Sequence, residues 1–398
     1  MKLTALNSLK FCLVAALTLG SAGWLCADQT LDIDKGITVM GHTKPIPVSL
    51  SGFDGEVLSV LKFDLYVQGF SLTTPDAAQF LISGTDTGSV SATVTDTIAR
   101  QPVLSRAYSG ASLRRQAHFL ANDIVSAIAH RPGIGLTKIA FKKEISLGHG
   151  EIYVSDFDGF NPQAVTHDDT IVAAPCWVPG RLALYYTSYY PGSPDIFFSS
   201  LSSGQRAIVA KYSGLNTAPA VSPDGSKLAM VLSRSGSPNI WVANADGTNP
   251  RQLTSTPEDS SPCWSPDGQW ICFATKTKQY DRRMLAKVPA TGGELQVIRT
   301  AGVSSPSEPD WSPDGKWIAF TRQAGKEFDI CVVPADGSSD PFVLVPGEDP
   351  SWSANSRTLI FTRRAGGTYA LSVLDVMTKQ VKDIKRISGN DSQPAWAR

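Results

Sequence analysis

One segment recurs through the C-terminal two-thirds of this sequence, and it constrains the fold more than any other feature. The clearest copies read SPCWSPDGQWICF from Ser261, APAVSPDGSKLAM from Ala218 and EPDWSPDGKWIAF from Glu308. A proline stands near the start of each unit, weaker copies included, and recurs about every 44 residues. The six prolines are Pro175, Pro219, Pro262, Pro309, Pro350 and Pro394. A period of this length with short apolar runs is typical of a β-propeller.

The residues of each copy specify a β-hairpin. Pro-Asp-Gly is a tight turn, because proline fixes φ, aspartate bonds the local backbone and glycine adopts positive φ. An apolar strand such as Ile318–Phe320 follows the turn. The strand before the turn carries a tryptophan in five copies, at Trp177, Trp264, Trp311, Trp352 and Trp396. Two more strands complete each blade, which must stack on its neighbours to bury its faces.

The order of strands predicts how the array closes. It begins with a second strand at Ile139–Phe141, which lacks its first strand, and ends with a first strand at Gln393–Trp396. Pairing these two segments completes the missing blade and removes the exposed sheet edges that invite aggregation. The sequence therefore predicts an all-β six-bladed β-propeller at residues 134–398, closed by its C-terminal strand.

The N-terminal residues 1–27 resemble an export signal. Lys2 and Lys10 provide a basic start, and Phe11–Leu19 is an apolar run too short to cross a bilayer. We expect cleavage after Ala27, a periplasmic or secreted mature chain, and no direct membrane insertion. Lys plus Arg and Asp plus Glu both number 36, so no global field favours nucleic acid.

Residues 28–42 are expected to form an extended N-terminal arm, and residues 43–133 a small α/β domain. A helix from Ala111 to His130 has an apolar stripe of Leu113, Ala117, Leu120, Ile124 and Ile128. Arg114, Arg115 and Asp123 lie off this stripe, so we expect them to be solvated. His118 is interpreted as a packed or surface histidine rather than a site residue.

Catalytic and metal-binding motifs are not apparent in the sequence. It has no Gly-x-Ser-x-Gly elbow and no Gly-rich phosphate loop, and its histidines lack ligand spacing. Asp224, Asp267 and Asp314 occupy identical turns, which makes them structural residues. Cys263 and Cys272 face each other across a hairpin and could form a disulfide or remain two buried thiols. We expect no enzyme activity, no cofactor and no metal.

Acidic and amide residues recur in the loops that precede the six prolines. Either these loops are simply solvated, or they form a polar funnel mouth that docks a protein or peptide. The residues are Asp168, Asp169, Asn216, Glu258, Asp259, Glu308, Glu348, Asp349, Asn390 and Asp391.

The whole predicted mature chain resembles the TolB family. The resemblance is most specific where LRRQAHFLANDIVSAI is followed by GLTKIAF and then IYVSDFDGFNPQAVT. It implies a monomeric, non-enzymatic periplasmic adaptor of the Tol-Pal system, which supports outer-membrane integrity and constriction during cell division. The implied partners are a Pal-like lipoprotein, bound at one propeller face, and a TolA-like inner-membrane protein, reached through the arm.

Carried over by motif, the resemblance implies partner-binding residues at Leu215, Asn216, Ala218, Asp259 and Ser260. For the N-terminal arm it implies Asp32, Asp34 and Lys35. Leu215 stands where relatives carry a polar histidine. The alternative function is that of an exported propeller that binds a small ligand, or hydrolyses it with carboxylates in its funnel.

Overall fold

The structure is a computed structural model that describes residues 40–277, 280–365 and 367–398. The predicted arm residues Asp32, Asp34 and Lys35 and the predicted export signal lie outside this range. Within the described residues, no helix is both long enough and apolar enough to cross a membrane.

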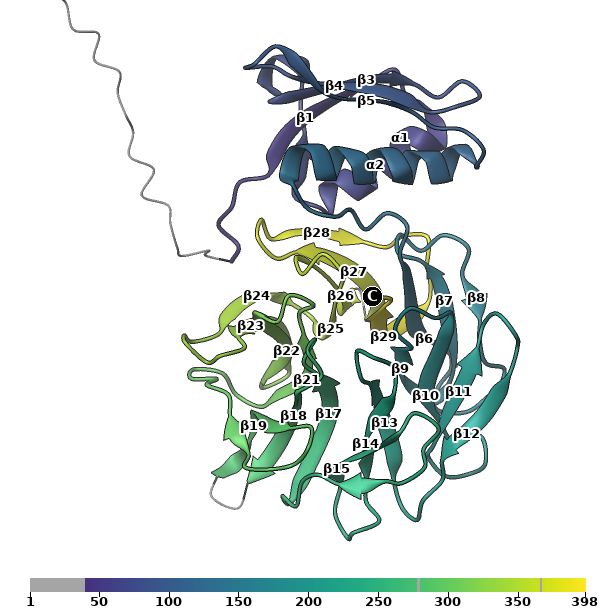
Figure 1. Cartoon of the computed structure of the whole chain (residues 1–398), viewed down its shortest axis with the longest axis vertical. Helices are drawn as coiled ribbons and strands as arrows, with labels where there is room; N and C mark the ends of the chain where they lie inside the picture. Colours follow the sequence, from purple (N-terminus) through teal and green to yellow (C-terminus); the bar gives the residue numbers. More distant parts are fainter. Residues whose placement is uncertain (1–39, 278–279, 366) are drawn as a thin grey trace, which may run out of the picture. The chain divides into compact units, whose positions relative to one another are not determined.

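An α/β domain precedes the propeller (Figure 1). Its five-stranded sheet has the order β2-β1-β3-β4-β5, with β1 parallel to both of its neighbours and the remaining pairs antiparallel. Buried apolar side chains of the sheet and the two helices, including Val48, Leu61 and Leu120, form its core. The elements are β1 (Ile46–Ser51), α1 (Gly55–Tyr66), β2 (Phe70–Leu72), a 3-10 turn (Pro75–Ala77), β3 (Phe80–Thr85), β4 (Ser91–Asp96), β5 (Gln101–Ala107) and α2 (Leu113–Ala129).

The remaining strands form six four-stranded antiparallel sheets, which we call blades 1 to 6. Blade 1 is β9 (Val172–Trp177), β10 (Ala183–Ser188), β11 (Asp195–Ser200) and β12 (Arg206–Ala210); blade 2 is β13 (Asn216–Val221), β14 (Lys227–Leu232), β15 (Asn239–Asn244) and β16 (Arg251–Gln252). Blade 3 is β17 (Glu258–Trp264), β18 (Trp270–Thr277), β19 (Tyr280–Pro289) and β20 (Gln296–Val297); blade 4 is β21 (Pro306–Trp311), β22 (Trp317–Ala324), β23 (Glu327–Pro334) and β24 (Phe342–Pro346). Blade 5 is β25 (Glu348–Trp352), β26 (Thr358–Ala365), β27 (Thr368–Asp375) and β28 (Gln380–Asp383); blade 6 is β29 (Asn390–Trp396), β6 (Lys138–Ser146), β7 (His149–Asp156) and β8 (Gln163–Ala164).

Closure of the ring by the C-terminal strand is confirmed. Strand β29 pairs with β6, so that Trp396 lies opposite Ile139 and Ala395 opposite Ala140. The two strands lie side by side in Figure 1, although they are at opposite ends of the propeller sequence. Trp396 is buried, its Nε1 donates to Thr137 Oγ1 at 2.8 Å, and its ring stacks on Phe157.

The repeated turns are built as their residues predict. In blade 3, Asp267 Oδ1 accepts hydrogen bonds from Ser265 Oγ at 2.5 Å and from the Gln269 backbone amide at 3.0 Å, and Gly268 has a φ of 69°. These bonds lower the pKa of Asp267. Asp224 and Asp314 make equivalent bonds. All three aspartates therefore serve the turns.

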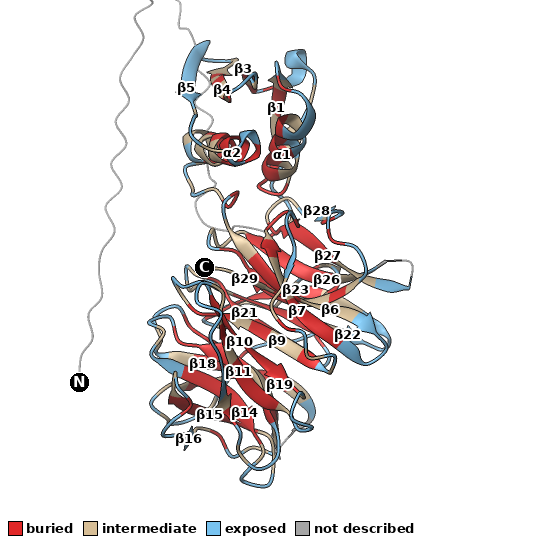
Figure 2. Ribbon diagram, turned by 90° about the vertical axis from the view of Figure 1, so that its right-hand side faces the viewer, coloured by how far each residue is buried: buried red, intermediate tan, exposed pale blue. Residues whose placement is uncertain are grey.

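The buried residues follow the strands of the propeller and the helix–sheet contact of the α/β domain (Figure 2). One prediction for helix α2 is wrong: Arg114 is buried rather than solvated. Its guanidinium bonds both oxygens of Asp158, in the turn after β7, at 2.5 Å. One helical turn on, His118 Nδ1 lies 2.7 Å from Asp64 Oδ2 of α1, and both side chains are buried.

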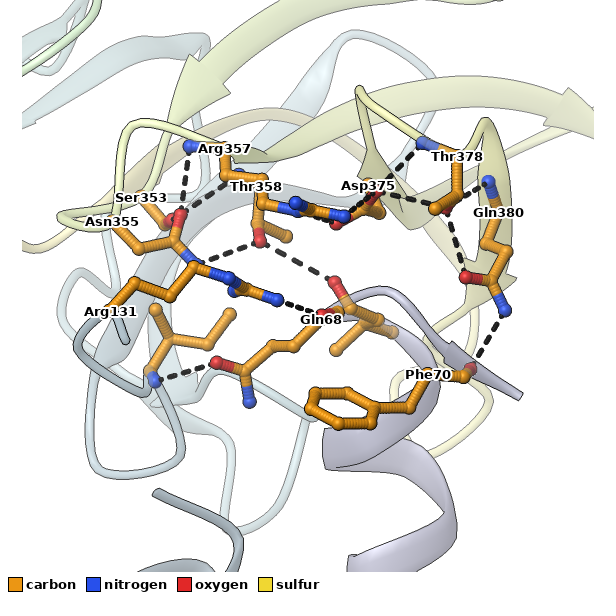
Figure 3. A network of polar contacts seen from close by, with 12 residues as sticks. Gln68, Phe70, Arg131, Ser353, Asn355, Arg357, Thr358, Asp375, Thr378 and Gln380 are labelled. Carbon is orange, nitrogen blue, oxygen red and sulfur yellow. Dashed lines mark hydrogen bonds and ion pairs between the residues drawn. The ribbon is translucent and has the colours of Figure 1, made fainter. Parts of the chain in front are cut away.

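A second set of polar contacts joins the α/β domain to blade 5 (Figure 3). Gln380 Nε2 donates to the Phe70 carbonyl at 3.0 Å, and Thr358 Oγ1 donates to the Val67 carbonyl at 3.4 Å. Beside them, Arg357 forms an ion pair with buried Asp375. These contacts hold the α/β domain at the Pro-Asp-Gly-type turn of blade 5, where Ser353 and Asn355 lie.

Candidate binding face

The first strand of every blade contains the same β-bulge. Between two paired positions, the inner strand advances three residues while its neighbour advances two, as from Thr217 to Ala220 opposite Val231 to Ala229. The extra residue precedes the repeat proline and has a positive φ, between 50° and 55°, in all six blades. These residues are Ala174, Ala218, Ser261, Glu308, Asp349 and Gln393.

Hydrogen bonds across the blade junctions support these bulges. The Ala218 amide donates to Thr187 Oγ1 of blade 1 at 3.2 Å. The same contact recurs from Asp349 to Thr321 at 3.0 Å and from Gln393 to Thr362 at 3.1 Å. The bulge removes a backbone amide from the hydrogen-bond ladder of its own sheet, and a threonine of the preceding blade accepts the hydrogen bond of that amide instead.

The six bulge residues surround the entrance to the central channel, which we call the mouth. A cavity of about 380 Å³ opens there, lined by all six bulge residues and by the six repeat prolines. Ile171, Thr187 and Tyr189 add to the wall on the side of blades 1 and 2. The α/β domain contacts the propeller at the other ends of the strands, through Asp158 and Gln380, so this domain leaves the mouth uncovered.

The same six prolines also line a second cavity, of about 440 Å³, toward the Pro-Asp-Gly turns. Trp177, Trp264, Trp311 and Trp396 make up much of its wall. Arg398 lies in it, with its guanidinium bonded to Asp310 and to the carbonyls of Trp311 and Trp352. Arg398 therefore ties blade 6 to blades 4 and 5 within the channel.

Two carboxylates line the mouth on neighbouring blades, Glu308 on blade 4 and Asp349 on blade 5. Glu308 Oε2 accepts from Thr321 Oγ1 at 2.7 Å and from the Asp349 amide at 3.3 Å. Asp349 Oδ2 accepts from Thr362 Oγ1 at 2.9 Å. Burial raises the pKa of Asp349 well above its usual range, and the charges of Glu308 and Glu348 raise it further. This side of the mouth is therefore acidic and poor in counter-charge.

Two of the residues expected to bind a partner are buried. The Asn216 side chain bonds the backbone of Tyr212 through both its Oδ1 and its Nδ2, each at 2.8 Å. Asp259 accepts bonds from the hydroxyls of Thr254 and Thr256 and from Asn239 Nδ2. These side chains fix the loops that lead into β13 and β17, a role that acidic loop composition did not reveal.

The other three expected residues lie where a partner can reach them. Leu215 is exposed just before β13, and Ala218 lines the mouth. Ser260 is half-buried in β17, next to Ser261. The mouth thus brings Ala218 and Ser261 of blades 2 and 3 together with Glu308 and Asp349 of blades 4 and 5.

Metal ligation and thiol chemistry are the remaining chemical possibilities for the described residues. Within residues 40–277, 280–365 and 367–398, no three His, Cys, Asp or Glu side chains are placed to hold a metal ion. Cys263 and Cys272 lie opposite each other on β17 and β18, and both are free thiols. The sequence left open either a disulfide or two buried thiols, and the structure has two buried thiols.

The fold and the mouth define a class: a β-propeller protein with an accessory α/β domain and an open channel entrance that can receive a partner. Residues 126–398 match the family model for the TolB beta propeller domain. The chain belongs to this family.

Two kinds of relatives extend this comparison. The Tol-Pal system proteins TolB of Desulfosudis oleivorans and Anaeromyxobacter dehalogenans are 33% and 34% identical to this chain over 163 and 166 residues. These matches span 40% and 39% of this chain and 36% of each relative's length. The crystal structure of TolB from Acinetobacter baumannii has a TM-score of 0.80, with 20% identity, over 90% of this chain and 98% of that one.

A further solved structure shows that the fold alone does not identify the function. A chain of the nidogen/laminin complex has a TM-score of 0.53 and 14% identity, over 66% of this chain and 98% of that one. Propellers with different roles therefore share this architecture, and function must be argued from the site.

Proposed function

We propose that this protein is a non-enzymatic periplasmic adaptor of the Tol-Pal system. It binds a Pal-like lipoprotein through the mouth of the propeller and couples to a TolA-like inner-membrane protein through the N-terminal arm, residues 28–42. In this role it supports outer-membrane integrity and constriction during cell division.

The observation that carries the proposal is the open mouth, in a chain whose propeller matches the TolB family over residues 126–398. The inner strands are held in place by buried ties such as Asn216 and Asp259, so the rim is preorganised. A rigid rim loses little conformational entropy when a partner docks. Leu215, Ala218 and Ser260 supply accessible contact positions, and Asn216 and Asp259 act through the loops they support.

The proposal is tested by isothermal titration calorimetry of the mature protein with the periplasmic domain of the same organism's Pal-like lipoprotein. A Leu215→Arg, Ser260→Arg double variant places two bulky charges at the rim, and we expect its Kd to rise at least tenfold. The matched control is Val297→Arg, an exposed position on the outer strand β20. If the wild-type protein does not bind, or if the double variant binds as tightly, the docking face is wrong.

The arm is tested separately. Deletion of residues 28–39, which keeps Met40 buried against blades 4 and 5, is expected to abolish capture of the TolA-like protein's periplasmic domain and to leave binding at the mouth intact. A triple variant, Asp32→Ala, Asp34→Ala and Lys35→Ala, narrows the contact to the three residues that the family resemblance implies. Retained capture by the deletion protein would exclude the arm.

A further inference from the structure

Among the side chains that the structure describes, the large exposed apolar ones on the mouth face lie on three adjacent blades. They lie in hairpin tips and loops of blades 6, 1 and 2, and Leu147 is the most exposed at 95%. Tyr190 follows at 62%. We call this set the apolar arc: Ile145, Leu147, Ile171, Tyr190 and Leu215.

Backbone contacts show that neighbouring parts of the arc adjoin. The Gly150 amide, beside the β6–β7 tip, donates to the Thr170 carbonyl at 2.9 Å, next to Ile171. The Tyr189 amide donates to the Ile171 carbonyl at 2.9 Å, which brings the β10–β11 tip alongside. Single exposed apolar residues are ordinary on protein surfaces, but a contiguous set next to a cavity indicates an interaction site.

The other half of the mouth face has a different character. Its tips and loops, on blades 3 to 5, have no large exposed apolar side chain among the residues whose side chains the structure describes, which leave out 277–281 at the β18–β19 tip. Charged side chains there are largely paired, as Glu258 is with Lys276 and Arg283. Inside the mouth on this side, Glu308 and Asp349 share two threonine hydroxyls and have no basic partner among the contacts that the structure records.

This asymmetry specifies the chemistry of what docks there. We propose that the protein occupying the mouth sets an apolar anchor on the arc of blades 6, 1 and 2 and directs a basic side chain toward Glu308 and Asp349 on blades 4 and 5. The inference rests on the proposed function and adds to it the orientation and the recognition chemistry of the partner.

A protein fits this surface better than a membrane does. An anionic lipid headgroup would meet the carboxylate of Glu308 as it approached the mouth, and like charges in a partly desolvated cavity repel. A cationic side chain meets opposite charge there. The apolar arc, at the rim, then provides the area from which water is excluded.

Three variants test the inference in the calorimetric assay above. Leu147→Ser removes an exposed apolar side chain, and we expect the Kd to rise about tenfold, as for loss of an interface anchor. Leu182→Ser is the matched control. Like Leu147, Leu182 is exposed, but it lies just before β10 of blade 1, at the end of the blade away from the mouth. Its Kd should stay within about twofold of wild type, as peripheral residues behave.

Glu308→Gln keeps the hydrogen-bonding shape and removes the charge. Wild-type affinity is expected to fall as salt rises from 50 to 500 mM, and the slope should be smaller for Glu308→Gln. Binding by wild type with unchanged affinity in Leu147→Ser, or an equal salt slope in both proteins, overturns this inference and leaves the proposed function standing. Absence of wild-type binding overturns both. Binding to phosphatidylglycerol vesicles that Leu147→Ser abolishes would assign the arc to a membrane and overturn the inference.

Discussion

Substitution of Trp396 by alanine tests whether the C-terminal strand holds the ring closed. Trp396 is 3% exposed, and its Nε1 donates to Thr137 Oγ1 at 2.8 Å. Its ring stacks on Phe157 with centroids 6.0 Å apart. Truncating a buried tryptophan costs about 3–5 kcal/mol through the cavity it leaves. We expect the free energy of unfolding to fall by an amount in that range.

The measurement is urea unfolding followed by far-UV circular dichroism, which does not depend on the fluorescence of the deleted side chain. Trp264→Ala is the matched control, because Trp264 holds the same repeat position in blade 3 and its Nε1 donates to the Ala220 carbonyl at 2.9 Å. Both variants lose a buried tryptophan, so their global costs should be similar.

The two variants should differ in where the structure opens. Hydrogen exchange at the β6 amides that face β29 is expected to accelerate more in Trp396→Ala than in Trp264→Ala, because only the former loosens the closing pair. A cost below about 1 kcal/mol for Trp396→Ala, with the usual cost for a buried tryptophan in the control, would refute the role of β29 as the closing strand.

Three further predictions concern the rest of the chain. Arg114→Ala removes the close partner of buried Asp158 and leaves it only Arg386, whose Nε is 3.8 Å away, so it should cost up to about 3–5 kcal/mol in urea unfolding; a cost near zero would show that the pair is dispensable. Burial raises the pKa of Asp64 to about 6 from 3.8, so between these values Asp64 is protonated in the native state and ionised in the unfolded state. Wild-type stability should therefore fall as pH rises from 4 to 6. Asp64→Asn should flatten this fall, and an equal slope in both proteins would contradict the raised pKa of Asp64. Ala218→Val forces a β-branched residue to positive φ and should cost about 1–2 kcal/mol, more than Thr217→Val at the adjacent position of extended strand.

The architecture could be predicted because its information is local and repeated. Each Ser-Pro-Asp-Gly copy encodes its own turn through bonds within five residues, as Ser265 and Asp267 show. The unpaired strands at the two ends of the array then leave one way to close the ring. Strand β2, three residues long, was not predicted, because Phe70–Leu72 shows no period of its own.

The details of the mouth could not be predicted for the opposite reason. A residue before proline favours extended backbone, yet six such residues have positive φ, because each is the extra residue of a channel-facing bulge. At three of the six, a threonine of the preceding blade bonds the backbone amide of that residue. Acidic residues in loops are usually solvated, but Asp259 is buried by two threonine hydroxyls that the strand arrangement brings to it. Likewise Arg114 lies off the apolar stripe of its own helix and is buried by Asp158 of a different domain.

These buried ties determine which parts of the mouth can change. Removal of Asn216 or Asp259 would leave backbone or hydroxyl groups unpaired and cost about 1–3 kcal/mol, so such a change loosens the loop before it alters recognition. Leu147 and Tyr190 are more than half exposed and Leu215 is 37% exposed, so substitution of any of the three removes less buried area than substitution of a core residue. Substitutions there change the docking surface without changing the frame that presents it. Differences in partner preference between propellers of this kind should therefore arise in the exposed tips, while the bulges and their hydrogen-bonded supports keep the rim in one shape.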